Sequence, residues 1–365
     1  MSQEFVGKFN FWSEKLWLPP NQTWEGVKSP LFSDFQYGIF VSIVLSIMRI
    51  LLCKSGLGYK QVKRVPHNPQ FEEYFLKNKR PSPSDIKILS KKFDISEIQI
   101  SDWFRRKRNS AKFHVIVKFV ESGWKFSFYF CIFCYGIYCL HKEPFLYDTA
   151  YYFRDYPHHD ISPCIFWYYT IELSYYVTGL IWIFVEVKRK DFAVMFSHHV
   201  LTVILIVFSF LTNYFRIGSV IMLLHDAADF WLEAAKMLKY VGKFRSCMFC
   251  FGTFILVWTV TRLYYFPVWV ISSIVFVAPG QIGFYPALNG FLAFLCGLQV
   301  LHLFWTIQII QTALKSLTYG QMSSDARSDS EMSESESEHP NGLQKNVARV
   351  LTNQVQEKMF FRSPL

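Results

Sequence analysis

Charge is scarce in this sequence of 365 residues, since only 18% of them are Asp, Glu, Lys or Arg. A chain with so few charges and 52% hydrophobic residues is not an intrinsically disordered protein. The chain has eight cysteines, and the two Cys-x-x-Cys pairs, Cys131/Cys134 and Cys247/Cys250, lack histidine or cysteine partners at zinc-finger spacing. We interpret these pairs as packing residues. The first 35 residues have no uninterrupted apolar core of the kind found in cleavable signal peptides.

Long apolar runs are what the sequence does have. Apolar stretches of about 18 to 25 residues recur through the chain, long enough to cross a hydrocarbon core of ~30 Å as helices. Seven spans are expected, at 36–53, 125–141, 163–187, 195–212, 217–235, 247–271 and 286–314. The fold class that follows is all-α, a polytopic membrane protein with about seven transmembrane helices.

Basic residues are distributed unevenly between the two sides of these spans. If the N-terminus is lumenal, the cytosolic loops hold 23 Lys and Arg residues and the lumenal segments hold 6. This bias follows the positive-inside rule. Residues 1–35 are therefore expected in the lumen, where the sequon at Asn21 is available for glycosylation, and the C-terminus is expected in the cytosol.

The cytosolic segment 54–124 is polar enough to form a small helical module. Helical periodicity appears at 69–78, 84–93 and 97–113. Asp85 and Ser96 occupy positions where helix caps are expected.

The end of this segment, Ile98-Gln-Ile-Ser-Asp-Trp103-Phe104-Arg105-Arg106-Lys107-Arg108, resembles the recognition helix of a homeodomain. We therefore expect a homeobox-like module over 66–116. DNA binding is not expected, because Arg106 stands where that family has the asparagine that pairs with adenine. Attraction of the basic run to anionic lipid, or to the phosphates of a substrate, is the simpler use.

The composition changes abruptly after the last span. Residues 317–365 include an acidic, serine-rich run at 323–338 that is too polar to bury a core, so we expect a disordered cytosolic tail. Three serines have Glu three residues downstream, the pattern of an acidophilic kinase: Ser328, Ser333 and Ser335. Their phosphorylation is expected to tune activity by adding negative charge.

Ionisable side chains cluster in two neighbouring spans, where each is costly unless it pairs, lines a cavity or takes part in chemistry. The cluster comprises His198 and His199 with Thr202, and then His225, Asp226, Asp229, Glu233 and Lys236. Spacings of three and four place the three carboxylates on one helical face. The helix rise puts the cluster about 5–16 Å inside the cytosolic helix ends. The pattern predicts a polar shaft open to the cytosol; a network that only holds the bundle together is the alternative.

The same residue types could bind a metal ion. Membrane di-iron enzymes, however, use His-x-x-x-His and His-x-x-His-His boxes, which this sequence lacks, so we expect no metal. Nearer to the lumen, Glu172 and Arg262 each lie about nine residues from the lumenal end of a span. Because their depths match, we predict that they form a buried ion pair.

Three runs together resemble the Lag1 motif of ceramide synthases. They are Lys188-Arg189-Lys190-Asp191-Phe192-x-x-Met195-x-x-His198-His199-x-x-Thr202, Asn213-x-x-Arg216-x-Gly218, and His225-Asp226-Ala227-Ala228-Asp229-x-x-Leu232-Glu233-x-Ala235-Lys236. The resemblance extends from Phe11-Trp-Ser-Glu-Lys-Leu-Trp-Leu-Pro-Pro to the acidic tail. Over this length the chain is similar to the homeobox-containing members of the family. Ala228 replaces a serine that is common in the family, and a small residue there leaves the acidic face intact.

The resemblance implies an endoplasmic reticulum enzyme with a TLC-type catalytic domain over 117–316. That enzyme would join the acyl group of acyl-CoA, as cosubstrate, to the amine of a sphingoid base, and no cofactor is expected. The residues alone indicate only a cytosol-facing acid–base site within the bilayer. On the residues, two alternatives stay open: a non-catalytic lipid-sensing or lipid-transport protein of the same fold, and a membrane-tethered DNA-binding regulator.

Roles follow from this reading. His198, nearest the cytosolic mouth, is expected to be nucleophile or general base, with His199 as a second polar contact. Asp226 and Asp229 are expected to orient imidazole and to accept the amine proton. The expected substrate-binding residues are Thr202, Asn213, Arg216, His225, Glu233 and Lys236. A covalent acyl-histidine route and direct acyl transfer are equally open.

The sequence leaves two further properties open. In the family that this chain resembles, the lumenal connection before the last span influences acyl chain length. Here that connection is 275–286, and its sequence does not reveal the preferred length. Nor does the sequence say whether the protein is monomeric or a homo- or heterodimer. Membrane lipids are expected partners in each case.

Overall fold

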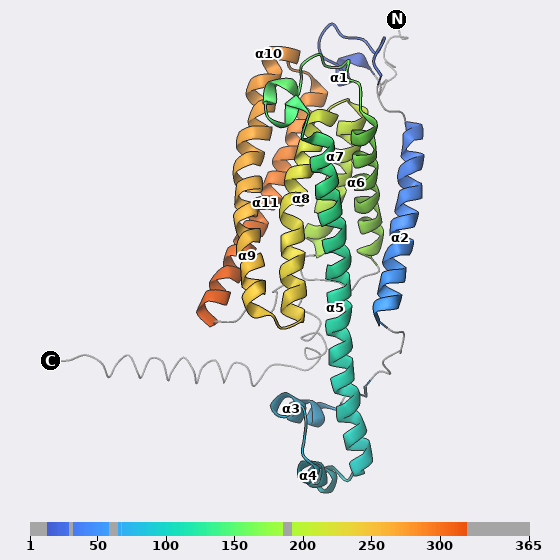
Figure 1. Cartoon of the computed structure of the whole chain (residues 1–365), viewed down its shortest axis with the longest axis vertical. Helices are drawn as coiled ribbons and strands as arrows, with labels where there is room; N and C mark the ends of the chain where they lie inside the picture. The colour runs from blue at the N-terminus through green and yellow to red at the C-terminus, as the bar shows by residue number, and fades with distance from the viewer. Residues whose placement is uncertain (1–12, 29–31, 58–64, 67, 185–191, 320–365) are drawn as a thin grey trace, which may run out of the picture.

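The computed structural model describes residues 13–28, 32–57, 65–66, 68–184 and 192–319, and all regular structure in these ranges is helical. A bundle of long helices forms one end of the molecule and a small three-helix module forms the other (Figure 1). The predicted all-α class is confirmed for this part of the chain. Two predictions lie outside the described residues: the tail with its three candidate phosphoserines, and the start of the Lag1-like motif at 188–191.

Four helical stretches are long and apolar enough to cross a membrane: Phe35–Leu52, Phe192–Leu211, Phe244–Ile282 and Pro286–Leu317. They belong to α2 (Phe35–Leu57), α7 (Phe192–Leu211), α9 (Phe244–Trp258) with its continuation, and α11 (Pro286–Tyr319). The protein is therefore a multi-pass membrane protein. The other three predicted spans fall on α5 (Glu97–Leu140), α6 (Pro163–Trp182) and α8 (Phe215–Tyr240). That these also cross the membrane stays a prediction.

Helix α8 is enclosed by its neighbours and packs mainly against α5 and α9. Every residue of the run Ile217–Leu223 is buried, which requires other helices on all sides. Helix α2, in contrast, stands at the edge of the bundle (Figure 1) and exposes most of its large apolar side chains. It approaches α6 through small residues: Ser174 Oγ donates to the Gly38 carbonyl at 2.9 Å, and Ser42 Oγ to the Ser174 carbonyl at 3.2 Å.

The three-helix module consists of α3 (Pro69–Lys77), α4 (Pro83–Phe93) and the start of α5. It has a core of its own, made of Phe71, Phe75, Leu89, Ile100, Trp103 and Phe104. Ser96 caps α5, as predicted, by accepting from the Gln99 amide at 3.3 Å. At α4 the prediction was wrong: Ser82 is the N-cap, and Asp85 completes the capping box by accepting from the Ser82 amide at 2.9 Å.

Two helices continue past the boundaries that polarity predicted. Helix α5 runs unbroken from the module into the bundle, so the predicted cytosolic loop 54–124 ends in helix. Helix α9 continues through π-helical η4 (Thr259–Ile271) and η5 (Ser273–Val277) into α10 (Ala278–Ile282). The predicted lumenal connection is therefore largely helical. Pro267 lies inside η4, where its missing N–H interrupts an α-type hydrogen-bond ladder.

The remaining elements are short: α1 (Glu14–Trp17), and the 3₁₀ turns η1 (Phe32–Asp34), η2 (Pro144–Leu146) and η3 (Thr149–Tyr151). The last two lie in the α5–α6 connection, which is closed by a disulfide between Cys139 and Cys164. This disulfide was not predicted from the sequence. The packing interpretation of the Cys-x-x-Cys pairs holds for buried Cys247 but was wrong for Cys131 and Cys134, which are exposed on α5.

Candidate active site

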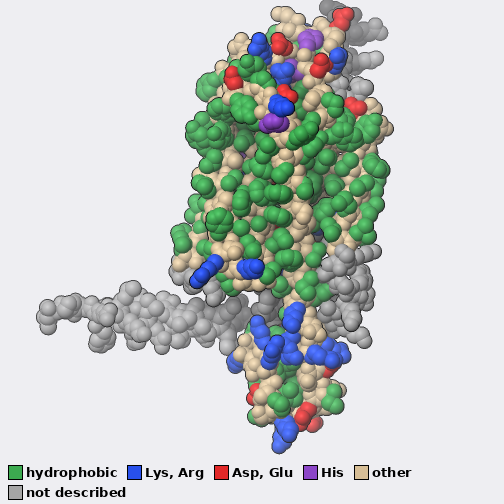
Figure 2. Space-filling view, in the orientation of Figure 1, with side chains coloured by type: hydrophobic (Ala, Val, Ile, Leu, Met, Phe, Trp, Pro, Cys, Tyr) green, Lys and Arg blue, Asp and Glu red, His purple; other side chains and the backbone are tan. Residues whose placement is uncertain are grey.

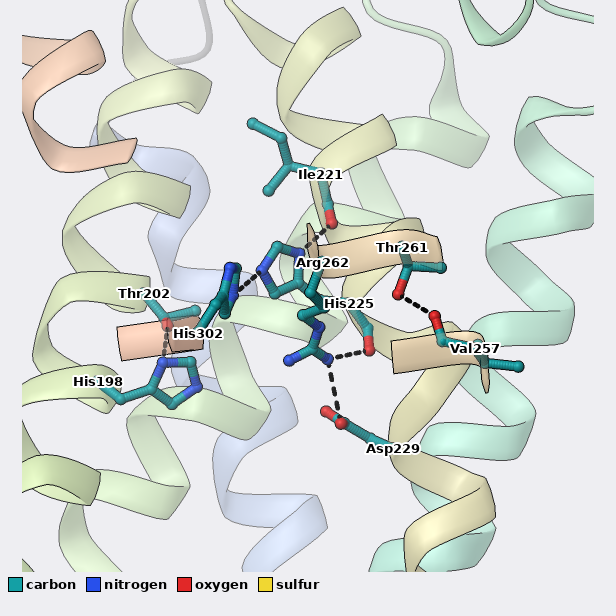
Figure 3. A network of polar contacts seen from close by, with 9 residues as sticks. All are labelled: His198, Thr202, Ile221, His225, Asp229, Val257, Thr261, Arg262 and His302. Carbon is teal, nitrogen blue, oxygen red and sulfur yellow. Dashed lines mark hydrogen bonds and ion pairs between the residues drawn. The ribbon is translucent and has the colours of Figure 1, made fainter. Parts of the chain in front are cut away.

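Helix α7 presents the adjacent histidines in two directions. The His198 ring is half-buried, and its Nδ1 lies 3.5 Å from Thr202 Oγ1, one turn along the helix (Figure 3). The ring also meets the Trp305 ring of α11 edge-on, at a centroid distance of 4.9 Å. His199 is turned away, and its Nδ1–H donates to the Met195 carbonyl at 2.8 Å. The two rings therefore point in different directions, as the ~100° step between neighbouring residues of a helix requires, although both contact the Tyr176 ring.

Each acidic side chain of α8 has its own polar partner. Asp226 accepts a hydrogen bond from the Tyr168 hydroxyl at 3.0 Å. Asp229 is paired with Arg262 at 3.1 Å, and Glu233 with Lys236 at 2.8 Å. Within the described residues, neither aspartate is bonded to His198, so the predicted orientation of that imidazole by Asp226 and Asp229 has no direct contact behind it. Thr202 and Trp305 are the neighbours that position the ring.

Arg262 connects α8 to η4 (Figure 3). Besides Asp229, its Nη2 contacts the His225 carbonyl at 2.5 Å, and its guanidinium lies 4.5 Å above the centre of the Trp258 ring. The predicted Glu172–Arg262 ion pair was therefore wrong. The Glu172 carboxylate oxygens have no hydrogen-bond partner among the described residues and face the same cavity as Asp226. Matching depth did not determine which way around its helix each side chain points.

A second histidine pair lies deeper in the bundle. His225 Nδ1 is 2.6 Å from the Ile221 carbonyl, an acceptor, so Nδ1 carries a hydrogen. In the neutral ring, Nε2 is then an acceptor, and it lies 3.0 Å from Nε2 of His302 on α11 (Figure 3). His302 is fully buried and is the donor in this arrangement. His302 lies within the last predicted span, but it was not among the site residues predicted from the sequence.

Two cavities meet at His198. The outer cavity encloses about 1400 Å³, and its wall includes four cations, Arg49, Lys125, Lys236 and Arg262, against two carboxylates, Asp229 and Glu233. The inner cavity encloses about 480 Å³ and has a mainly apolar wall. His198 and Tyr176 line both. The Tyr176 hydroxyl makes no hydrogen bond to the described residues, so it is available to a bound molecule.

Most of the predicted site residues line one of these cavities. Thr202, His225 and Asp226 line the inner cavity, and His199, Asp229, Glu233 and Lys236 line the outer cavity. Asn213 and Arg216 do not. They hold the α5–α6 connection instead, through Asn213 Nδ2 to the Pro157 carbonyl at 3.0 Å and Arg216 Nη1 to the Tyr151 carbonyl at 2.9 Å.

Several residues at the site were not singled out for it by sequence, among them Arg49, Tyr176, His302 and Trp305. Arg49 and His302 are ionisable residues inside apolar spans. The same criterion identified the predicted histidines and carboxylates, so it could have found these two as well. Tyr176 and Trp305 carry no such signal in a chain that is 19% aromatic. Within the described residues, no group of three or more His, Cys, Asp or Glu side chains is arranged to hold a metal ion.

Comparison with known proteins places this geometry in context. The model of the TLC domain matches residues 118–311. Ceramide synthase 5 of Mus musculus is 38% identical over 339 residues, which cover 88% of this chain and 82% of the relative. Ceramide synthase 4 of Mus musculus is 34% identical, with coverage of 90% and 88%, and ceramide synthase 3 of Homo sapiens is 33% identical, with 88% of each chain covered.

Proposed function

Because this chain belongs to the TLC-domain family and, within it, to the ceramide synthases, we propose that it transfers a fatty acyl group from acyl-CoA to the amine of a sphingoid base. As a ceramide synthase, the protein is an acyltransferase. The observation that carries the finer proposal is the position of His198, which alone among the described histidines lines both cavities. An acyl-CoA that spans both cavities places its thioester where they join, within reach of a base at that junction.

The reaction forms a C–N bond between the amine and the thioester carbon and breaks the C–S bond, and CoA leaves as the thiol. In direct transfer, His198 takes the amine proton as general base and passes it to the departing sulfur. In the covalent route, His198 attacks the thioester carbon and CoA leaves as thiolate, which takes a proton from water; the amine then attacks the acyl-histidine, the C–N bond to the ring breaks, and the amine proton passes to the freed imidazole. We assign the Tyr176 hydroxyl as the hydrogen-bond donor to the oxyanion, because it faces the same junction. The atoms balance without a redox or metal cofactor.

The two cavities suit different parts of the substrates. The excess of cations over carboxylates in the outer cavity favours the polyanionic CoA moiety. The inner cavity, with apolar side chains such as Leu205, Leu295 and Leu298, favours the hydrocarbon of the acyl group. Arg262 pairs with Asp229 and Lys236 pairs with Glu233, so neither carboxylate is a free base at this surface.

We also propose an endoplasmic reticulum location with a lumenal N-terminus. The excess of basic residues in the predicted cytosolic loops supports it. The disulfide between Cys139 and Cys164 lies in a connection predicted to be lumenal, and disulfides persist in that oxidising compartment. These two arguments rest on different residues and agree.

The test is an assay of the purified full chain in lipid nanodiscs, with sphinganine and a series of acyl-CoAs. We expect N-acylated product from the parent and a loss of roughly 10²–10⁴-fold in rate for His198→Ala. His158→Ala is the matched control, since His158 is exposed in the α5–α6 connection, and its rate should equal that of the parent. No product from a folded parent protein would overturn the proposed substrates.

The covalent and direct routes differ in one intermediate. After rapid mixing with acyl-CoA alone and rapid quenching, an acyl adduct on His198 would establish the covalent route. With activity intact and adduct loss excluded by the quench time, the absence of an adduct would establish direct transfer. His199→Ala is informative in the same experiment, because His199 lines only the outer cavity and should leave any adduct in place.

A further inference from the structure

The inner cavity shares one lining residue with a third cavity. This back cavity is a narrow space between α2, α6 and α7, and its wall includes Gly38, Tyr169 and Leu173. Ile206 of α7 lines both the inner cavity and the back cavity, and it is the one residue of the described walls that the two share. It is 4% exposed, so its side chain fills the space between them.

Position along α7 relates these cavities to the reacting centre. Ile206 lies eight residues beyond His198, about 12 Å along the helix axis, and Phe210 lies about 6 Å further. Ser209, at the far part of the inner cavity, is about 16 Å from His198 along the same axis. The back cavity therefore extends the inner cavity away from the chemistry.

The other walls at this depth are less easily moved. A Cβ built on Gly218 would lie 1.9 Å from the Tyr169 hydroxyl and 2.8 Å from Ser209 Oγ, so these groups pack in direct contact. Tyr169 also hydrogen-bonds Ser209 Oγ at 3.1 Å and the Phe215 carbonyl at 3.3 Å. Ser209 and Gly218 line the inner cavity and Tyr169 lines the back cavity, so these polar contacts hold one part of the wall between the cavities in place. The part formed by Ile206 is an aliphatic side chain alone.

We propose that Ile206 limits the length of the acyl chain that this enzyme transfers, and that the back cavity receives the end of a longer chain once that side chain is shortened. This inference rests on the proposed function, with the acyl chain in the inner cavity. An extended chain advances about 1.25 Å per carbon, from a C–C bond of about 1.5 Å. About ten carbons therefore reach the level of Ile206, and about 13 reach Ser209.

Shortening Ile206 to Ala removes three carbon atoms from the wall. The added space accepts two or more further methylenes, and each buried methylene strengthens binding by about fourfold. For the longest acyl-CoAs, we compare the amount of each ceramide with that of the ceramide whose acyl chain is two carbons shorter. In Ile206→Ala this ratio should be roughly tenfold higher than in the parent. The preference among sphingoid bases should not change.

The experiment gives the nanodisc protein an equimolar mixture of acyl-CoAs from C12 to C24 and measures the ceramides by mass spectrometry. Ile206→Ala is compared with Ile204→Ala, a matched change on the same helix at an outward-facing residue that is 39% exposed. The control should keep the parental profile. Ile206→Val, which removes one methyl group, should shift the profile in the same direction by a smaller factor. It serves as the test variant if Ile206→Ala does not accumulate in the membrane.

An Ile206 variant that is active and retains the parental acyl profile would overturn the inference while leaving the proposed function intact. A second panel varies the sphingoid base at one fixed acyl-CoA. If Ile206→Ala changes the preferred length of the base and not of the acyl group, the inner cavity holds the base, and the inference is equally overturned. Lack of activity in the parent would instead count against the proposed function itself.

Discussion

At the scale of single residues, Arg262 holds the site together from outside α8. It bonds both the Asp229 carboxylate and the His225 carbonyl. Arg262→Gln should destabilise the protein by roughly 1–3 kcal/mol, because it removes the charged partner of the half-buried Asp229 carboxylate. Thermal unfolding in detergent measures this. The double variant Arg262→Gln/Asp229→Asn should recover part of the loss, and an unchanged melting temperature in the single variant would contradict the pairing.

A pH dependence is expected at His159 in the α5–α6 connection. Its Nε2 lies 2.7 Å from the Arg154 carbonyl, and burial, with the nearby Arg216 guanidinium as the second cause, holds its pKa below the ordinary value of 6.5. The unfolded chain therefore binds this proton more readily, so stability is complete above pH 6.5 and falls as the pH drops from 6.5 towards the folded-state pKa.

The melting temperature should consequently fall more between pH 7.5 and 5.5 in the parent protein than in His159→Gln, which has no imidazole to protonate. His158→Gln serves as the control at the exposed neighbour and should behave like the parent. Equal pH profiles for the parent and His159→Gln would show that the buried imidazole does not couple to unfolding.

Much of the candidate site could be predicted from residue spacing on single helices. His198, Thr202, His225 and Asp226 all reach the inner cavity, because helical periodicity within one span determines which positions share a face. Partners between helices could not be predicted in this way. The pairing of Arg262 with Asp229, and not with Glu172, depends on the rotation of η4 about its axis, which depth alone does not specify.

At the scale of elements, the disulfide between α5 and α6 should stabilise the bundle. The two cysteines are 25 residues apart, so the cross-link restricts the unfolded chain and contributes about 3 kcal/mol in the chain-entropy description. Cys139→Ser should lower the melting temperature under non-reducing conditions. Cys296→Ser, at an exposed free cysteine of α11, is the matched control. A reductant should lower the melting temperature of the parent but not that of Cys139→Ser.

Helix identity was predictable, but helix ends were less so. Each of the seven predicted spans coincides with helix in the described residues, because long apolar runs need internal hydrogen bonds in lipid. Polarity marks where lipid contact ends, and a helix can continue into water. This is why α5 extends 28 residues before the predicted span at 125–141, and why the helical stretch starting at Phe244 reaches Ile282.

At the scale of the whole molecule, side-chain type separates into bands. On the face that Figure 2 shows, a broad apolar belt covers the bundle, with Lys and Arg side chains at and below its lower edge and charged side chains of both signs above its upper edge. Asn21 is exposed and belongs to the segment predicted on the opposite side, in the lumen. Expression in mammalian cells should therefore give a glycosidase-sensitive form, which Asn21→Gln and Thr23→Val should both abolish. A glycosidase-insensitive parent would remove the support that this sequon gives to the orientation.

The continuity of α5 has a mechanical consequence. Its 44 residues form a rod of about 66 Å that contains no proline. Trp103 is fixed in the core of the module, while Trp124, Lys125 and Tyr129, about 32 Å or more along the same rod, form part of the wall of the outer cavity. Because one continuous helix joins the two parts, a tilt or twist of the module would also displace this part of the outer cavity wall.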